Sequence, residues 1–260
     1  VRSVALSADG RRVVTASKDR TAKIFDRATG ECLLTLEGHR KYVNSAAFSP
    51  DGQYVLTASD DGKSRIFHAG TGACECTLDG GDSCANSAVF SPDGGRALVA
   101  SNDNVAKIFD VWTGSCEQTL FGHTSFLNSA VFSPDGLKVL TASDDRTARL
   151  FDGASGHCEG EFRSHTKAVN SAEFSPNGRQ IATASDDCSL LLWDTATGTC
   201  KRKHLHQKAV NSAVFSPDGH FVLTASADRI ARLFNTMTNE CTMTFAGHEG
   251  AVYGAAFGTC

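Results

Sequence analysis

The chain has little that would anchor it in a membrane or attract it to polyanions. Its 260 residues contain no apolar run near the roughly 18 residues that a membrane-spanning helix needs, and no signal-peptide pattern opens the sequence. The formal net charge is −4 at pH 7, which gives no general attraction to nucleic acid or anionic lipid. We therefore expect no membrane association, and we regard nucleic acid as a disfavoured partner.

Proline is scarce, and its positions reveal a repeat. All five prolines precede Asp-Gly or Asn-Gly in the same kind of turn, at Pro50, Pro92, Pro134, Pro176 and Pro217. Proline presets φ and glycine accepts φ > 0, so each turn marks a chain reversal. The apolar residue before the turn recurs every 42 residues, with one interval of 41, at Leu6, Phe48, Phe90, Phe132, Phe174, Phe215 and Phe257. The shorter interval reflects one residue missing between Cys200 and His206.

Each repeat has room for four short strands and for no long helix. The expected strands resemble residues 43–49, 54–59, 63–67 and 32–36, with turn signals about every ten residues. The second is almost continuously apolar, as in a strand covered on both faces, and the fourth alternates apolar and polar residues. One four-stranded unit cannot bury both of its faces, whereas units stacked side by side in a closed ring can. The sequence therefore predicts an all-β fold, a β-propeller of four-stranded antiparallel blades.

The repeats use up the whole chain, so we expect one domain. Six complete repeats and a partial seventh are expected at residues 1–37, 38–79, 80–121, 122–163, 164–204, 205–246 and 247–260. Because Val1 lies inside a first strand and residues 252–257 resemble another, we expect the chain to be part of a longer protein with a seven-bladed ring. A six-bladed ring, in which residues 252–257 compete for the place of the first strand, is the alternative.

Ten cysteines could suggest disulfides or a metal site, but their positions argue against both. Six of them open the fourth strand of successive repeats, at Cys32, Cys74, Cys116, Cys158, Cys200 and Cys241. Equivalent positions on stacked sheets lie about 10 Å apart or more, beyond the roughly 7 Å that a disulfide tolerates, so we expect small buried hydrophobes. No histidine with ligand spacing joins Cys74, Cys76 and Cys84, so no metal or other cofactor is expected. Free thiols favour a reducing compartment, the cytoplasm or alternatively the nucleus.

These features together resemble the WD-repeat (Trp-Asp repeat) family of β-propellers over the whole chain. The markers are Gly-His before the first strand, the Ser-Pro-Asp-Gly turn, Thr-Ala-Ser-x-Asp after the second strand and an aromatic-Asp pair closing the third. The resemblance implies a non-catalytic scaffold that binds proteins or peptides within a larger assembly. It also implies a buried hydrogen-bond chain in each repeat, from Trp through Ser or Thr and His to Asp.

The residues of that chain can be assigned by position. The fifth repeat has all four members, which are His165, Thr183, Asp187 and Trp193. Phe replaces Trp in the second, fourth and sixth repeats, which keep His39, Thr57, Asp61, His123, Thr141, Asp145, His206, Thr224 and Asp228. In the third repeat Gly81 and Val99 replace His and Thr together, which avoids a buried unpaired hydroxyl that would cost roughly 1–3 kcal/mol. Because the set recurs, we expect a structural role and not a catalytic triad.

The residues expected to point to one exposed face of the blades are the candidates for partner binding. They lie at the start of the first strand and just before the turn Asp, on one face: Tyr42, Asn44, Asp60, Asn86, Phe126, Asn128, Asp144, Asn170, Asp186, Asn211 and Tyr253. Rim aromatics are common interface anchors, and the neighbouring aspartates favour a basic peptide. The asparagines could instead be structural and hold ordered water.

Two other functions stay open from the sequence. One is an enzyme with a single site at the central channel of the propeller. The other is a binder of nucleic acid or an acidic ligand through residues 201–203, Lys-Arg-Lys, on the fourth strand of the fifth repeat. Charge that protects an exposed edge strand from pairing with another sheet explains that run equally simply.

Overall fold

The computed structural model describes residues 1–257, and the regular elements in that range are all β-strands. They form six four-stranded sheets in which the strand order follows the chain order and every pairing is antiparallel. The predicted all-β fold with four-stranded antiparallel blades is thereby confirmed. No helix in the described part of the chain is long and apolar enough to cross a membrane.

The chain divides into two compact units, each of which contains three blades. The first comprises residues 1–122 and 153–156, and the second comprises 123–152 and the chain from 157 onward. Blades one to three contain β1 (Ser3–Leu6), β2 (Arg12–Ala16), β3 (Ala22–Asp26), β4 (Cys32–Leu36), β5 (Val43–Phe48), β6 (Tyr54–Ser59), β7 (Lys63–His68), β8 (Cys74–Asp79), β9 (Ala85–Phe90), β10 (Arg96–Ser101), β11 (Ala106–Asp110) and β12 (Cys116–Leu120). Blades four to six contain β13 (Leu127–Phe132), β14 (Lys138–Ser143), β15 (Ala148–Asp152), β16 (Cys158–Phe162), β17 (Val169–Phe174), β18 (Gln180–Ser185), β19 (Ser189–Asp194), β20 (Cys200–Leu205), β21 (Val210–Phe215), β22 (Phe221–Ser226), β23 (Ala231–Asn235) and β24 (Cys241–Phe245).

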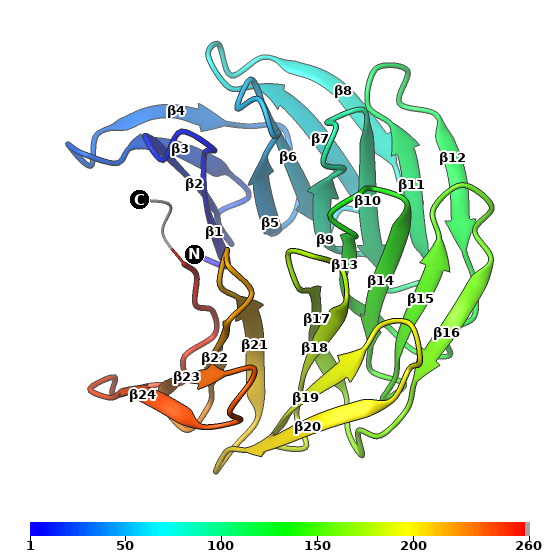
Figure 1. The fold of residues 1–260 in the computed structure, drawn as a ribbon. Helices are drawn as coiled ribbons and strands as arrows, with labels where there is room; N and C mark the ends of the chain where they lie inside the picture. Colours follow the sequence, from blue (N-terminus) through cyan, green and yellow to red (C-terminus); the bar gives the residue numbers. More distant parts are fainter. Residues whose placement is uncertain (258–260) are drawn as a thin grey trace. The chain divides into compact units, whose positions relative to one another are not determined.

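The hydrophobic core lies between successive blades. First strands pack against each other, β1 on β5 and β5 on β9 in the first unit. The fourth strands β4 and β8 lie at the opposite edge of their blades (Figure 1). In the core between blades one and two, Ile24 and Leu36 meet Val55 and Phe67, and all four are almost fully buried. Burying a side chain such as Phe67 contributes about 1.5–3 kcal/mol relative to leaving it exposed. Each blade is therefore stabilised mainly by its neighbours.

Residues 252–257 were predicted to form the first strand of a further blade, and this prediction is wrong for the structure. They form no strand, although Val252 makes the contacts that begin a first strand in other blades. Its N–H donates to the Ser226 carbonyl at 3.0 Å, as that of Val43 donates to Ser17. A first strand elsewhere pairs with the second strand of its own blade, and the described residues supply no such strand here. The missing ladder partner explains why the segment forms no strand.

The prediction that the repeated cysteines are buried hydrophobes is also wrong. Five are exposed and Cys158 is half-buried; the exposed five are Cys32, Cys74, Cys116, Cys200 and Cys241. The physical reason is their place in the sheet. Each opens the outermost strand, which has a ladder partner on one side only, and pairs with the third strand beyond a bulge, as Cys32 does with Phe25. The described cysteines are all free, and no group of His, Cys, Asp and Glu within residues 1–257 is arranged to hold a metal ion.

We expect iodoacetamide to alkylate Cys32 and Cys116 of the native protein faster than Cys76 and Cys84. The first two thiols are exposed, whereas burial raises the pKa of Cys76 and of Cys84 and so lowers their thiolate fraction. Peptide mapping by mass spectrometry over a time course measures each rate, with denatured protein as the control in which the rates converge. Protection of Cys32 until unfolding would contradict the exposed position.

Candidate functional site at the upper ends of the blades

The upper end of a blade consists of the loop before its first strand and the turn between its second and third strands. The two are clamped by a backbone hydrogen bond, which in blade two runs from the Asp60 N–H to the Tyr42 carbonyl at 2.9 Å. The same bond joins Asn102 to Cys84, Asp144 to Phe126, Asp186 to Ala168 and Ala227 to Ala209, at 2.9–3.0 Å. The clamp uses main-chain atoms, so the side chains that it displays are free to differ.

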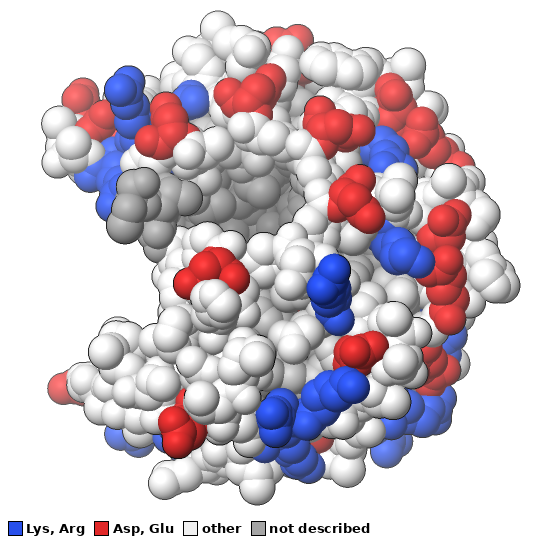
Figure 2. Space-filling view, in the orientation of Figure 1, with Lys and Arg blue, Asp and Glu red and all other residues white. Residues whose placement is uncertain are grey.

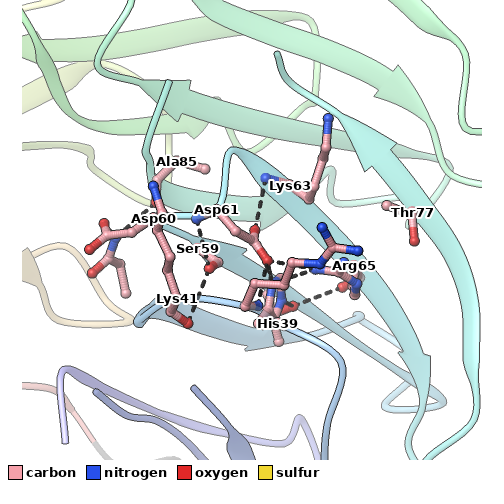
Figure 3. A network of polar contacts seen from close by, with 12 residues as sticks. His39, Lys41, Ser59, Asp60, Asp61, Lys63, Arg65, Thr77 and Ala85 are labelled. Atoms are coloured by element: carbon pink, nitrogen blue, oxygen red, sulfur yellow. Dashed lines mark hydrogen bonds and ion pairs between the residues drawn. The ribbon is translucent and has the colours of Figure 1, made fainter. Parts of the chain in front are cut away.

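A buried polar network fixes the loop behind this clamp in blade two (Figure 3). His39 Nε2 lies 2.7 Å from the Thr57 hydroxyl, and His39 Nδ1 lies 3.1 Å from the Asp61 carboxylate. Asp61 also accepts the Arg40 N–H at 2.9 Å, which ties the loop to the turn. Burial alone would raise the pKa of Asp61, but the N–H groups and His39 around it lower that pKa to about 2. Asp61 is therefore a carboxylate at neutral pH.

Arg65 decides the direction of the hydrogen bonds in blade two. Its guanidinium donates to His39 Nδ1 at 2.5 Å and to Asp61 at 3.2 Å. Because Nδ1 accepts, the ring proton is on Nε2, which donates to Thr57, and the Thr57 hydroxyl donates to the Arg65 carbonyl at 3.2 Å. The sequence analysis missed this arginine. The sequence does mark the position, because a basic residue stands four residues after the turn Asp in most repeats. The equivalents of Arg65 are Lys23, Lys107, Arg149 and Arg232.

Blade five contains the complete four-member chain, and its hydrogen bonds run in the opposite direction to those of blade two. The Trp193 indole N–H donates to the Thr183 hydroxyl at 2.9 Å, and that hydroxyl lies 2.8 Å from His165 Nε2. His165 Nδ1 lies 2.9 Å from Asp187, so its proton points to the carboxylate. Leu191 stands where the other blades have a cation, so no guanidinium competes for Nδ1. Blade four has the same His123 contacts, 2.7 Å to both Thr141 and Asp145, with Phe151 in place of tryptophan.

In blade three a lysine replaces the missing histidine. Lys107 Nζ donates to the Gly80 carbonyl at 2.5 Å and pairs with Asp103 at 3.2 Å, so it ties the loop to the turn as histidine does elsewhere. Val99, at the threonine position, is 2 % exposed and leaves no hydroxyl unpaired. The sequence indicated that blade three has lost His and Thr together, but it did not indicate that Lys107 takes over the role of the histidine.

In blade six an arginine separates the histidine from the turn aspartate. Arg232 lies between Asp228 and His206, 2.7 Å from each, and the His206 to Thr224 contact lengthens to 3.4 Å. Burial lowers the pKa of His206 to about 4, and the Arg232 charge acts in the same direction. A second ring, His204, packs on Phe234 with centroids 4.2 Å apart. His204 occupies the place that a buried leucine has in blades one to three, and its Nε2 has no hydrogen-bond partner.

These threonine–histidine–aspartate sets are arranged for structure. The hydroxyls of Thr57, Thr141, Thr183 and Thr224 belong to side chains that are fully buried. A nucleophile must reach its substrate, and each hydroxyl instead contacts a histidine and a second internal group. The arrangement can hold loops in place, and it offers no position for a reacting atom.

The asparagines of the candidate surface join neighbouring blades. Asn44 donates to the Asp60 carboxylate at 2.6 Å and to the Ala85 carbonyl of the next blade at 3.0 Å. Asn128 and Asn170 repeat both contacts, with Asp144 and Asp186 in their own blades. Asn86 donates to the Asn102 side chain at 2.6 Å and Asn211 to the Val252 carbonyl at 2.7 Å. These amide donors are committed to internal bonds, so contact with a partner would fall to other groups beside them.

The aromatic residues of the candidate surface are accessible. Tyr42 is 46 % exposed, Phe126 49 % and Tyr253 76 %. The Lys18 ammonium lies 5.9 Å from the centroid of the Tyr42 ring, within the range of a cation–π contact. Ala168 and Ala209 hold the corresponding clamp position in blades five and six. The clamp therefore does not require an aromatic side chain.

The basic run on β20 is exposed but already has internal partners. Lys201 lies 3.8 Å from Asp194, and Arg202 donates to the Met237 carbonyl at 3.3 Å. Figure 2 shows basic side chains where β20 lies in Figure 1, with acidic side chains nearby. Because the charges are mixed, this edge lacks the single-sign field of a polyanion-binding surface.

We expect His206→Gln to reduce the acid sensitivity of the fold. A histidine with a pKa of about 4 in the fold and about 6.5 when unfolded stabilises the native state above pH 6.5, and this stability falls as the pH drops toward 4. The loss of unfolding free energy between pH 7 and pH 5 should shrink by about 1–2 kcal/mol after allowance for solvent screening. Urea titrations at both pH values measure it. His220→Gln, an exposed change in the same blade, is the control, and equal pH dependence in both variants would refute this role of His206.

Comparison with known proteins agrees with the geometry. A family model described as "WD domain, G-beta repeat" matches residues 1–26, 30–68, 72–110, 114–152, 156–194 and 198–235. Five of the matches run from just before a fourth strand to the end of the next blade's third strand, as residues 30–68 do from β4 to β7. A 40-residue segment is 45 % identical to "WD repeat-containing protein 86" of Homo sapiens, and it covers 15 % of this chain and 11 % of the human protein. With family matches over most of its length, the chain belongs to the WD-repeat family of β-propellers.

Proposed function

We propose that the chain is a non-catalytic scaffold that binds protein or peptide partners through the upper ends of its blades. The observation that carries the proposal is the shared main-chain clamp with different side chains on it. At one position the clamp displays Tyr42, Cys84, Phe126, Ala168 and Ala209. Alanine satisfies the backbone there, so the half-exposed rings of Tyr42 and Phe126 are not needed for folding. Half-exposed aromatic side chains are typical anchors of protein interfaces.

The chemistry beside these rings favours a peptide with basic residues. Asp60 adjoins Tyr42 through the clamp, and Asp144 adjoins Phe126 in the same way. Each carboxylate accepts a bond from the amide of an asparagine, and its negative charge favours a cationic group of the partner. The Lys18 ammonium near the Tyr42 ring illustrates the kind of contact that a lysine or arginine of the partner would make.

The other two functions have less support. An enzyme needs a nucleophile and base that reach a substrate, and the recurring hydroxyl sets are buried. The run on β20 is balanced by Asp194 and by a carbonyl, which suits protection of an edge strand. The free exposed thiols fit a reducing compartment, so we place the protein in the cytoplasm, with the nucleus as the alternative.

We expect Tyr42→Ala and Phe126→Ala to weaken peptide binding without destabilising the fold. Peptides selected from a random displayed library and labelled with fluorescein provide the probe, and anisotropy gives the Kd. Removing an aromatic ring that the bound peptide covers should weaken binding about tenfold or more, equivalent to at least about 1.4 kcal/mol. The Tm should stay unchanged because alanine occupies the same position in blades five and six.

Leu137→Ala is the matched control, because Leu137 is also an exposed apolar residue, 63 % accessible, but lies in the turn between a first and a second strand. Its Kd should equal that of the unchanged protein. Unaltered affinity in the double variant Tyr42→Ala/Phe126→Ala would remove both rings from the binding surface.

A further inference from the structure

The turn between β2 and β3 of blade one places a lysine beside Tyr42. The Val43 N–H donates to the Ser17 carbonyl at 3.0 Å, which joins the loop before β5 to this turn. The main chain therefore holds Lys18 and Tyr42 next to each other. The Lys18 ammonium lies 5.9 Å from the centroid of the Tyr42 ring, within the range of a cation–π contact.

Lys18 differs from its counterparts in the other repeats. The equivalent residues of blades two to six are Asp60, Asn102, Asp144, Asp186 and Ala227. In blade two, Asp60 accepts a hydrogen bond from Asn44 at 2.6 Å. The corresponding two residues of blade one are Arg2 and Lys18, and two cations cannot form that bond. Lys18 is therefore left without the partner that Asp60 has in its own blade.

The carboxylate next to Lys18 in the sequence is held by other groups. Asp19 accepts the Thr21 N–H at 3.0 Å and the Thr21 hydroxyl at 2.7 Å within its own turn. Within residues 1–257 the exposed Lys18 ammonium makes no ion pair or hydrogen bond, so the Tyr42 ring is the group that it contacts. A cation–π contact at an exposed site is weak, and a better-held cation can displace it.

We propose that Lys18 is an internal competitor for the Tyr42 ring, which a lysine or arginine of the partner must displace before it can stack there. The proposal rests on the function proposed above, because it names the residue that limits the affinity of the same site for basic peptides. Two cations beside one ring also repel each other. Asp60 adjoins Tyr42 through the clamp, so a partner cation that reaches both groups gains more than Lys18 does. Lys18 therefore selects for partners that also engage Asp60.

Binding of basic peptides to variants of Lys18 tests this proposal. The probes are fluorescein-labelled peptides that contain lysine or arginine, selected from a random displayed library, and anisotropy gives the Kd. Lys18→Ala should lower the Kd about two- to fivefold, which corresponds to the loss of one exposed cation–π contact. Lys18→Arg keeps a cation beside the ring and should bind as the unchanged protein does. Neither change should alter the Tm, because Lys18 is exposed in a turn.

Two controls separate the ring contact from the net charge. Arg11→Ala removes one positive charge from the same blade, but Arg11 is exposed in the turn between β1 and β2, at the opposite end. The Kd of this variant should be unchanged. In a Tyr42→Ala background, Lys18→Ala should give no further change, because no ring is left to compete for.

Three results would overturn the proposal. One is an unchanged Kd for Lys18→Ala together with a raised Kd for Tyr42→Ala, which would leave the proposed function intact. Another is an equal gain from Lys18→Ala with and without the Tyr42 ring, which would show that the charge acts by itself. The third is weaker binding of Lys18→Ala, which would make Lys18 a contact for an acidic group of the partner. If Tyr42→Ala binds every peptide as tightly as the unchanged protein, the proposed function fails for this ring, and the inference fails with it.

Discussion

The structure depends on one constraint, which is that a four-stranded blade has two apolar faces and cannot cover either by itself. Strand β6 shows this, because Val55, Leu56 and the residues after them are buried although they point alternately to opposite faces. Both faces of β6 are covered by the adjoining blades, and the other core clusters lie at interfaces of the same kind within each unit. Strand interiors must therefore repeat, and variation is confined to strand ends, turns and the outermost strand.

The buried network at the upper end makes that variation usable. In blade two, histidine joins the loop before the first strand to a buried threonine, and the turn carboxylate accepts the N–H of the next loop residue, so loop and turn keep a fixed distance. Since Asp61 stays ionised and burial keeps the pKa of His39 low, the network contains one charge that several donors satisfy. A side chain such as Tyr42 is then displayed from a rigid frame, which under the proposed function would reduce the entropy lost on binding.

The sequence was sufficient to predict the features that recur in every repeat. It did not predict features that depend on which residues are neighbours in space. Proline turns and apolar spacing predicted the four strands of each blade, and the family resemblance, carried over by position, joined His165 to Thr183 and Asp187. The substitution of Lys107 for a histidine could not be predicted, because it depends on how far an ammonium reaches across a loop. The exposure of Cys32 depends on its place in the outermost strand, which has a neighbour on one side only. Such features require coordinates.

We assign the histidine networks to folding, and we propose that the varied side chains on the clamp serve binding. Chemical unfolding of His165→Ala tests it most directly, with the exposed neighbour change Thr166→Ala as the reference. We expect His165→Ala to lower the free energy of unfolding by about 1–3 kcal/mol, because Thr183 and Asp187 each lose a buried partner. Thr166→Ala should change it by less than about 0.5 kcal/mol. Equal unfolding free energies for the two variants would contradict the claim.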